Sequence, residues 1–325
     1  MENNSKIGIG FVGAGWMGAT LMQRIVERSD CRIAALHQRS PENAMLALDG
    51  LGLKPQLYTP DFNSMIADPA VDAVFLCSPN SSHGPQSIAA LEAGKHVFCE
   101  KPCATLHADF QKQLQLARAN PQLVTFVNYL MNFDTMEQRV LNMVESGDFG
   151  TITQVQVNYR HPININGDKA WKLSGDIMGD AIGMGIIHAL SVMLNIMTAN
   201  GTKPTSVFAT CSNNSIRGFE IPAIYNIQIS FDNEATGFCF GNVDQANGYD
   251  AYHNIHGTNG GLIFDSYLDR PDKVRLWSNS TTGGKWVYPL DPTRCPQDNL
   301  WPQETTTPDS GDVVKHQTGA CVEHF

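Results

Sequence analysis

The sequence predicts an α/β domain with a doubly wound parallel sheet over residues 1–128, followed by an α+β domain with a mostly antiparallel open sheet over residues 129–325. Three observations lead to this fold class. Short apolar runs alternate with longer amphipathic stretches in the first part, a glycine-rich turn follows the first run, and runs of alternating apolar and polar residues appear after residue 128. The length of 325 residues suits two hydrophobic cores better than one.

Six apolar runs in the first part are expected to be the parallel strands. Most of them lack the strict alternation of a strand with one solvated face, as expected when helices cover both faces of a sheet. Amphipathic helices fit between successive runs. The six runs are residues 7–12, 32–36, 56–58, 73–77, 96–99 and 124–127.

Two helix ends in this part are marked by their residues. Ser40 can accept a hydrogen bond from a free amide of the first turn, and Pro41 fits the first helical position because its missing N–H would be unpaired there. Gly94 can adopt the left-handed conformation that ends a helix. We therefore expect one helix to begin at Pro41 and another to end before Gly94.

The second part is expected to contain one early helix, over residues 134–145, and then strands. A hairpin turn is expected at residues 256–261, because Asn259-Gly260 tolerates the positive φ that tight hairpins need. Residues 291–311 are rich in Pro, Thr, Gln and Asp and predict a long surface loop. The clearest alternating runs are residues 154–159, 225–231 and 236–243.

The net charge is −10, and the lysines and arginines are scattered along the chain. This distribution argues against a nucleic-acid partner and a polybasic membrane anchor, so small molecules or proteins are the expected partners. The first six residues are polar, and the apolar run at 7–12 is far too short for a signal sequence or a spanning helix. The expected location is therefore the cytoplasm.

Cysteine usage indicates a reducing environment. No two cysteines have the C-x-x-C spacing, and several lie in apolar, strand-like runs. We expect reduced, buried thiols and no metal site. The eight cysteines are Cys31, Cys77, Cys99, Cys103, Cys211, Cys239, Cys295 and Cys321.

The turn after the first run has the pattern G-x-G-x-x-G, between an expected strand and an expected helix. Gly13 permits the tight turn, Gly15 lets the backbone approach a pyrophosphate, and Gly18 lets helix and strand pack closely. The free N–H groups of the helix N-terminus can bind the phosphates. The first domain is therefore predicted to be a Rossmann fold that binds a nicotinamide dinucleotide. The other residues of the turn, expected to line the same site, are Ala14, Trp16 and Met17.

The end of the second strand bears on the choice of cofactor. An acidic residue about 20 positions after the last glycine would bind the 2′-hydroxyl of the NAD ribose, but the chain has Gln38, Arg39 and Ser40 there. Arg39 can pair with a 2′-phosphate and Ser40 can donate a hydrogen bond to it, so the sequence favours NADP. NAD stays open, because Gln38 can bind a ribose hydroxyl through a neutral hydrogen bond.

Two further motifs resemble those of the Gfo/Idh/MocA oxidoreductase family. The first, at residues 72–83, is Asp-Ala-Val-Phe-Leu-Cys-Ser-Pro-Asn-Ser-Ser-His, and the second, at residues 90–102, is Ala-Leu-Glu-Ala-Gly-Lys-His-Val-Phe-Cys-Glu-Lys-Pro. The resemblance covers the first 128 residues and is loose elsewhere. It continues through residues 145–150, Trp171-Lys172, His188 and residues 257–260.

The resemblance implies that Ser78, Pro79 and Asn80 line the nicotinamide side of the cofactor and that Lys101 points into the active site. Pro102 favours an extended backbone at residue 101, at a strand end where an open α/β sheet exposes its ligand crevice. A poorly solvated ammonium loses its proton more readily and can help to move a hydroxyl proton, so Lys101 is expected to be catalytic. The remaining positions of the expected cofactor site are His83, Glu100, Trp171 and Lys172.

His188 matches the family histidine that begins the pattern H-x-x-D or a variant of it, and its imidazole suits removal of a hydroxyl proton. Its apolar neighbours leave open that it is a core histidine. The family usually has an aspartate four residues earlier, where this chain has Met184. Asp180 can substitute if the segment is helical throughout, because residues i and i+8 share a face, and Asp176 is a weaker candidate.

Two other positions depart from the family. Met131-Asn132 stands where many members carry a basic pair, which makes a neutral polyol or sugar a better substrate than an anion. The chain ends at residues 320–325, where members usually begin a final helix, so a truncated or unusual terminus is expected.

The leading expectation is an NAD(P)-dependent oxidoreductase that transfers hydride to or from a secondary alcohol of a sugar, inositol or related polyol. One alternative is a redox-neutral NAD-dependent glycosidase or lyase of the same family. Another is a ligand-sensing protein without turnover, which the intact Glu100-Lys101-Pro102 argues against. The resemblance also implies a homodimer or homotetramer.

Overall fold

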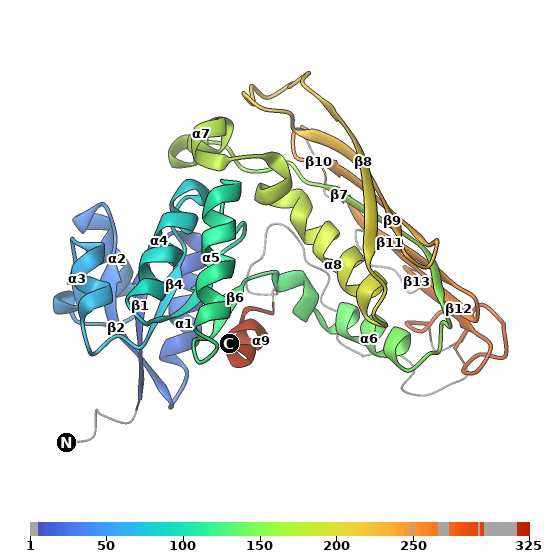
Figure 1. Ribbon diagram of the computed structural model, residues 1–325, viewed down its shortest axis with the longest axis horizontal. Helices are drawn as coiled ribbons and strands as arrows, with labels where there is room; N and C mark the ends of the chain where they lie inside the picture. The colour runs from blue at the N-terminus through green and yellow to red at the C-terminus, as the bar shows by residue number, and fades with distance from the viewer. Residues whose placement is uncertain (1–5, 247, 249, 266–272, 292, 296–316) are drawn as a thin grey trace. The chain divides into compact units, whose positions relative to one another are not determined.

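The computed structural model describes residues 6–246, 248, 250–265, 273–291, 293–295 and 317–325 (Figure 1). The chain divides into two compact units. The first comprises Met1–Asn128, Asp176–Gly179 and Thr318–Phe325, and the second comprises Tyr129–Gly175 and Asp180–Gln317. The two units are described one at a time below.

The first unit is built on a six-stranded parallel sheet with the order β3-β2-β1-β4-β5-β6. The order reverses beside β1, which is the topology of a doubly wound Rossmann fold. The predicted parallel sheet is therefore confirmed. Its strands are β1 (Ile7–Val12), β2 (Cys31–His37), β3 (Tyr58–Thr59), β4 (Ala73–Leu76), β5 (His96–Cys99) and β6 (Thr125–Val127).

Helices connect these strands, as expected for right-handed crossovers between parallel strands (Figure 1). The longest, α4 and α5, pack on each other. The helices are α1 (Trp16–Val26), α2 (Pro41–Gly50), α3 (Phe62–Ala67), α4 (Asn80–Glu92), α5 (His107–Ala119) and α9 (Thr318–His324), and α7 (Gly175–Met178) lies mostly in this unit.

The helix ends agree with the sequence at two places. The Ser40 hydroxyl accepts a hydrogen bond from the Asn43 N–H at the start of α2, and Gly94 follows α4 with φ of +75°. The third predicted strand is wrong over most of its length, because Pro55–Leu57 form a 3₁₀ turn and only Tyr58–Thr59 pair in the sheet. The fixed φ of Pro55 favours the turn, and proline has no N–H for a strand ladder.

An aromatic column forms part of the core of the first unit. Phe11, Phe75 and Phe98 lie opposite one another on β1, β4 and β5 and are buried. The rings of Phe75 and Phe98 stack with centroids 4.3 Å apart, and the ring of Phe325 meets them edge-on at 5.4 and 5.6 Å. Residues far apart in the chain therefore share one core.

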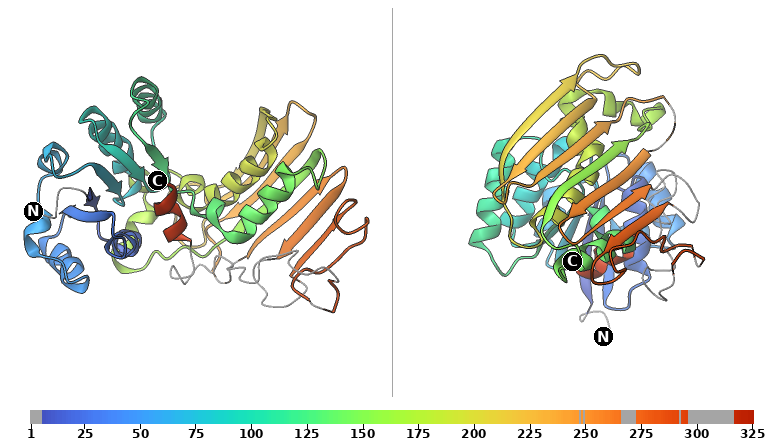
Figure 2. Two further views of the ribbon diagram at one scale, coloured as in Figure 1. Left: turned by 90° about the horizontal axis from the view of Figure 1, so that it is seen from below. Right: turned by 90° about the vertical axis from the view of Figure 1, so that its right-hand side faces the viewer.

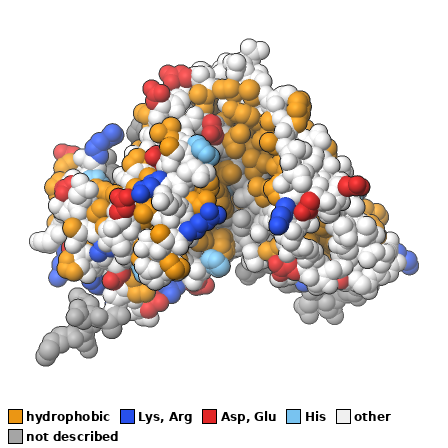
Figure 3. All heavy atoms as spheres, viewed as in Figure 1, with side chains coloured by type: hydrophobic (Ala, Val, Ile, Leu, Met, Phe, Trp, Pro, Cys, Tyr) orange, Lys and Arg blue, Asp and Glu red, His pale blue; other side chains and the backbone are white. Residues whose placement is uncertain are grey.

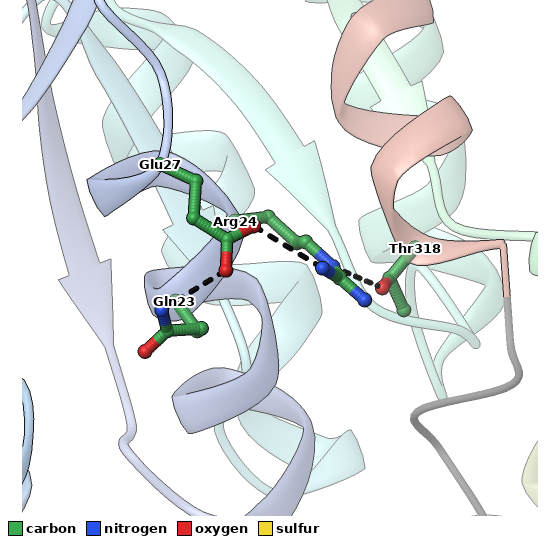
Figure 4. Close-up of polar contacts among 4 residues, drawn as sticks. All are labelled: Gln23, Arg24, Glu27 and Thr318. Atoms are coloured by element: carbon green, nitrogen blue, oxygen red, sulfur yellow. Dashed lines mark hydrogen bonds and ion pairs between the residues drawn. The ribbon is translucent and has the colours of Figure 1, made fainter.

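A polar contact also ties α9 to α1 (Figure 4). Arg24 donates a hydrogen bond from Nε to the Thr318 hydroxyl at 3.3 Å, and its Nη1 lies 3.1 Å from a carboxylate oxygen of Glu27. Gln23 donates to the other carboxylate oxygen of Glu27 at 3.0 Å. The Glu27 carboxylate thus holds the Arg24 guanidinium on the side of α1 that meets α9.

The second unit contains a seven-stranded sheet with the order β13-β12-β11-β7-β10-β9-β8. Only β7 and β10 pair in parallel, so the predicted, mostly antiparallel sheet is confirmed. The strands are β7 (Ile152–Arg160), β8 (Pro204–Ser212), β9 (Ile224–Phe231), β10 (Thr236–Asn242), β11 (Asp250–Gly257), β12 (Gly260–Asp265) and β13 (Val274–Ser278).

Helices cover one face of this sheet (Figure 2). α8 (Ile187–Thr198) packs on β7 and β10, and α6 (Thr135–Glu145) packs on α8. The predicted helix at 134–145 is therefore confirmed, with Asp134 as its N-cap. Shorter turns are η2 (Leu130–Phe133), η3 (Gly167–Leu173) and a π-helical turn η4 (Ile182–Ile186).

The hairpin predicted at residues 256–261 joins β11 and β12, but the reason given for it is wrong. Neither Asn259 nor Gly260 has a positive φ. The glycines are needed for space: a Cβ on Gly257 would overlap the Phe149 carbonyl oxygen, and one on Gly260 would lie 2.6 Å from the Phe149 ring. The tight approach of the residue-149 loop explains the glycines.

Charges are mixed over the face drawn in Figure 3, where lysines and arginines lie among aspartates and glutamates. Within the described residues, no helix combines the length and apolarity needed to cross a bilayer. The predicted loop at 291–311 lies almost entirely outside the described residues.

Candidate active site

The glycine-rich turn lies between β1 and α1 and has the geometry of a phosphate-binding turn. Gly13 has φ of +90°, and a Cβ there would lie 2.6 Å from the Cys77 carbonyl oxygen. A Cβ on Gly18 would overlap the Gly13 carbonyl oxygen, so α1 packs directly on the turn. These two glycines are required by the fold itself.

Gly15 differs, because nothing lies within 4 Å of a Cβ placed on it. It is the exposed N-cap of α1, and no side chain caps the helix there. No acidic residue occupies the first turn. The first N–H groups of α1 are therefore open to an anion, which fits the diphosphate of a dinucleotide. Of the neighbouring residues, Trp16 is exposed, and Ala14 and Met17 are half-buried.

The end of β2 is built differently from what the sequence suggested. The Ala14 N–H donates a hydrogen bond to the Gln38 side-chain oxygen at 3.3 Å, so Gln38 supports the glycine-rich turn. The Ser40 hydroxyl donates to the Glu42 carboxylate at 2.8 Å. Its single proton is therefore already used, which weakens the case for a 2′-phosphate contact from Ser40. Arg39 is exposed.

Three strand ends meet at one edge of the sheet. β1, β4 and β5 are neighbours and parallel, so the residues that follow them share the edge where α/β sheets bind ligands. The glycine-rich turn follows β1, Ser78 closely follows β4, and Glu100-Lys101 follows β5. The structure thus brings together the predicted phosphate-binding turn and the predicted catalytic lysine within the first unit.

Hydrogen bonds fix the segment after β4. The Ser78 hydroxyl donates to the Gln86 side-chain oxygen at 2.6 Å. The buried Asn80 amide donates to the Met178 carbonyl oxygen at 2.9 Å. Asn80 therefore anchors the Asp176–Gly179 segment to the first unit, a structural role that sequence alone did not indicate.

His83 joins this segment to the Glu-Lys-Pro motif. Its Nδ1 lies 2.7 Å from the Pro102 carbonyl oxygen, and its Nε2 lies 2.8 Å from the Ser78 carbonyl oxygen. Burial lowers the pKa of His83, so the neutral ring donates to one of the two carbonyls. Only 1% of His83 is exposed, so it orients the two segments and has almost no surface for a cofactor.

Lys101 has the electrostatic environment expected of a proton-transfer group. Burial lowers the pKa of its ammonium, and the charge of Glu100 acts in the opposite direction. Burial likewise raises the pKa of the Glu100 carboxyl, which accepts a hydrogen bond from the Asn128 amide at 2.6 Å. Glu100 is buried and faces Asn128, so its role is to hold the motif in place.

In the second unit, His188 lies in the first turn of α8 and is 8% exposed. The preceding residues form the π-helical turn η4, so the segment from Asp180 to His188 is not α-helical throughout. The α-helical i, i+8 spacing that would place Asp180 on the same face as His188 is therefore absent. Its carboxylate accepts a hydrogen bond from the Gly183 N–H at 2.5 Å and serves as a local cap. Asp176 is exposed and belongs to the first unit.

The other predicted positions of the second unit lie on separate turns. Trp171 and Lys172 are half-buried in η3, and the Lys172 ammonium lies 5.9 Å from the Trp171 ring centroid. Met131 is buried in η2 and is a core residue. The Asn132 side-chain oxygen accepts a long hydrogen bond, at 3.4 Å, from the Ser191 hydroxyl on α8. Within the described residues, no group of three His, Cys, Asp or Glu side chains could hold a metal.

Sequence reasoning missed Tyr159 and His161. Tyr159 is a buried residue of β7 whose ring centroid is 5.9 Å from that of His188. Its hydroxyl lies 3.0 Å from His161 Nδ1. The only available signal was a tyrosine on the apolar face of an alternating strand, where a hydroxyl needs a partner.

Comparisons with known proteins agree with this geometry. Residues 7–129 match the family model described as the oxidoreductase family with an NAD-binding Rossmann fold, and residues 138–263 match the model of the Gfo/Idh/MocA C-terminal domain. The predicted NAD-binding domain is therefore confirmed. The match names NAD and does not support the preference for NADP that residues 38–40 suggested.

Two curated relatives and one solved structure illustrate the likeness. The uncharacterized oxidoreductase YrbE of Bacillus subtilis is 26% identical over 83% of this chain and 76% of its own length. Inositol 2-dehydrogenase of Salmonella typhimurium is 29% identical over 47% of this chain and 45% of its own length, so the matched region spans about half of that enzyme. Levoglucosan dehydrogenase in complex with NADH and levoglucosan has a TM-score of 0.78 at 21% identity, covering 98% of this chain and 88% of its own, and shares the fold.

Proposed function

Because this chain belongs to the Gfo/Idh/MocA family of oxidoreductases, we propose that it oxidises a secondary alcohol of a sugar, inositol or related polyol with NAD. One observation carries the proposal. The open glycine-rich turn at Gly15 follows β1, and Lys101, whose pKa burial lowers, follows β5. Both strands flank β4 and end at the same edge of one parallel sheet. This edge therefore offers both a binding turn for a diphosphate and a group for proton transfer.

Each residue has a role in this scheme. The N–H groups of α1 bind the diphosphate, and Gln38 holds the turn that presents them. Lys101, poorly solvated and more easily deprotonated than a free lysine, accepts or relays the hydroxyl proton. His188 is proposed as a second proton acceptor. Bound NAD would accept the hydride at its nicotinamide ring.

Two solved structures of similar fold support the substrate class. The levoglucosan dehydrogenase structure contains a sugar derivative, and an aldose-aldose oxidoreductase of similar fold contains glycerol. The buried Met131 and the neutral Asn132 add no positive charge, which fits an uncharged polyol better than an anion.

The test measures binding and turnover separately. NAD binding is followed by calorimetry, and turnover by absorbance of reduced nicotinamide over a panel of sugars and inositols. Lys101→Ala should lower kcat by about 10²- to 10⁴-fold with little change in NAD affinity, whereas the exposed control Lys112→Ala should change neither. Absence of NAD binding, or binding without any absorbance change across the panel, would refute the dehydrogenase. Turnover without net reduction of NAD would instead indicate a redox-neutral enzyme.

We also propose that the chain forms a homodimer or homotetramer through the sheet of the second unit. β8 is an edge strand, and its residues are exposed from Pro204 to Cys211. The side chains of Val207 and Phe208 on this edge are 67% and 68% exposed. Apolar side chains on an open strand edge favour association with another chain. Light scattering should give twice or four times the chain mass, and Val207→Lys should reduce it; a concentration-independent monomer would refute the assembly.

A further inference from the structure

His188 lies against an aromatic side chain in the core of the second unit. The rings of His188 and Tyr159 have centroids 5.9 Å apart and are inclined by 43°. Position 184, where the resemblance to the family leads one to expect an aspartate, holds the buried Met184. The Asp180 carboxylate caps Gly183. Neither position therefore presents a carboxylate to His188 with the α-helical spacing that the family pattern uses.

The Tyr159 ring occupies a slot shaped by small residues. On the same face of the sheet, its neighbours on β10 and β11 are Gly241 and Ala251. From the other side, Gly185 approaches so closely that an added Cβ would lie 3.0 Å from the ring atom Cε1. Gly185 belongs to the π-helical turn η4, and such turns occur often at functional sites. The π turn thus brings backbone against Tyr159 directly before His188.

The hydroxyl of Tyr159 has its own anchor. It lies 3.0 Å from His161 Nδ1, and the backbone of His161 is held by a 2.9 Å hydrogen bond to the Asn242 carbonyl oxygen. Burial raises the pKa of the Tyr159 phenol, so the hydroxyl keeps its proton and acts through hydrogen bonding. The ring beside His188 is therefore fixed at both its face and its tip.

We propose that Tyr159, anchored by His161, is the positioning residue for His188 and does the work of the aspartate that Met184 replaces. The proposal rests on the proposed function, because it assumes that His188 accepts the proton of the substrate hydroxyl while hydride leaves the carbon for NAD. The protonated imidazole then lies at a distance from the Tyr159 ring where an aromatic ring stabilises a cation. Packing against Tyr159 thus orients the His188 imidazole, and the Tyr159 ring stabilises its protonated form.

Four single variants and one double variant test the proposal on the holoenzyme. Tyr159→Leu removes the ring, and Tyr159→Phe removes only the hydroxyl. Tyr252→Phe, on the adjacent strand β11, is the control for losing a tyrosine hydroxyl from a half-buried position of the same sheet. His188→Ala reports whether His188 matters at all. For each, kcat and KM are measured against pH, and NAD affinity and the melting temperature report folding.

Tyr159→Leu is expected to lower kcat about tenfold and to move the low-pH limb of the profile about half a unit toward lower pH, because the protonated imidazole loses its stabilising ring. Tyr159→Phe should lower kcat about threefold without moving the low-pH limb of the profile. Adding Met184→Asp to Tyr159→Leu should restore kcat at least in part and return the limb toward higher pH, since a carboxylate then orients the imidazole. A purely structural Tyr159 predicts no such rescue.

Different outcomes test the role of His188 and the positioning role of Tyr159. If His188→Ala keeps the wild-type kcat, the proposed role of His188 is wrong and this inference falls with it. If His188→Ala loses activity while Tyr159→Leu binds NAD and keeps both kcat and the pH limb, only the positioning role of Tyr159 is refuted. Loss of kcat in Tyr159→Leu without rescue by Met184→Asp would likewise overturn it.

Discussion

Replacing Gly15 by alanine should abolish tight NAD binding without harming the fold. Gly15 is exposed, has φ of −65°, and a Cβ there meets no atom within 4 Å. Alanine therefore fits the free protein, and a compatible Gly→Ala change stabilises by about 0.4–1 kcal/mol through the unfolded chain. In the complex, however, the new methyl group occupies the space through which a diphosphate must reach the N–H groups of α1.

Gly18→Ala provides the matched opposite case within the same turn. A Cβ on Gly18 would overlap the carbonyl oxygen of Gly13, which is backbone and cannot rotate away. Overpacking of this kind costs about 1–3 kcal/mol. Gly18→Ala should therefore unfold at lower denaturant concentration, whereas Gly15→Ala should unfold at or slightly above the wild-type midpoint.

Urea denaturation measures the free energy of unfolding, and calorimetry measures the dissociation constant for NAD. For Gly15→Ala we expect unchanged or higher stability and NAD affinity reduced more than about tenfold, equivalent to about 1.4 kcal/mol of lost binding free energy. Wild-type NAD affinity in this variant would show that no diphosphate approaches the turn. A large loss of stability would show that the space at Gly15 is not open.

Three other predictions concern charge. Apart from the low-pH limb assigned to His188, oxidation should speed up as pH rises through the pKa of Lys101, which burial lowers, because only the neutral amine accepts a proton. A pH–rate profile in which Lys101→Ala retains this second rise would contradict the assignment. Calorimetry should show NAD binding at least about tenfold more tightly than NADP, because the Ser40 hydroxyl donates its proton to the Glu42 carboxylate. Glu42→Gln should reduce this difference in affinity. Equal affinities in the wild type would disprove the prediction. The buried Glu137 Oε1 lies 3.0 Å from His253 Nδ1. His253→Leu leaves this buried oxygen without its polar neighbour and should cost about 1–3 kcal/mol in urea unfolding, and adding Glu137→Met should recover most of the loss. A neutral single variant would mean that the contact is unimportant.

Local chemistry explains why much of the first unit could be predicted from its residues. The limits of β1 and β5 follow from apolar runs that must be buried on both faces. The cap at Ser40 and the stop at Gly94 depend on one or two residues and their immediate neighbours. Gly13 and Gly18 belong to a turn whose backbone geometry is set within six residues, so their roles were visible without the fold.

Contacts between distant residues could not be predicted from neighbouring residues in the sequence. The Gln38 oxygen that supports the Ala14 amide depends on the pairing of β1 with β2. The ties from Asn80 to Met178 and from His83 to Pro102 depend on how segments are brought together after β4 and β5. Each involves a polar side chain that would be equally suited to bind a cofactor, and only its actual partner decides its role.

The sequence by itself determined the fold class, the dinucleotide-binding turn and the identity of Lys101 and His188 as candidates, because apolar periodicity, glycine geometry and short motifs act over a few neighbouring residues. The tertiary structure alone decided that Gln38 supports the Ala14 amide, that Asn80 binds the Met178 carbonyl oxygen, and that Tyr159 lies beside His188. The physical reason is that hydrogen-bond partners, burial and the pKa values that follow from them are set by atoms from distant parts of the chain, which only folding brings into contact.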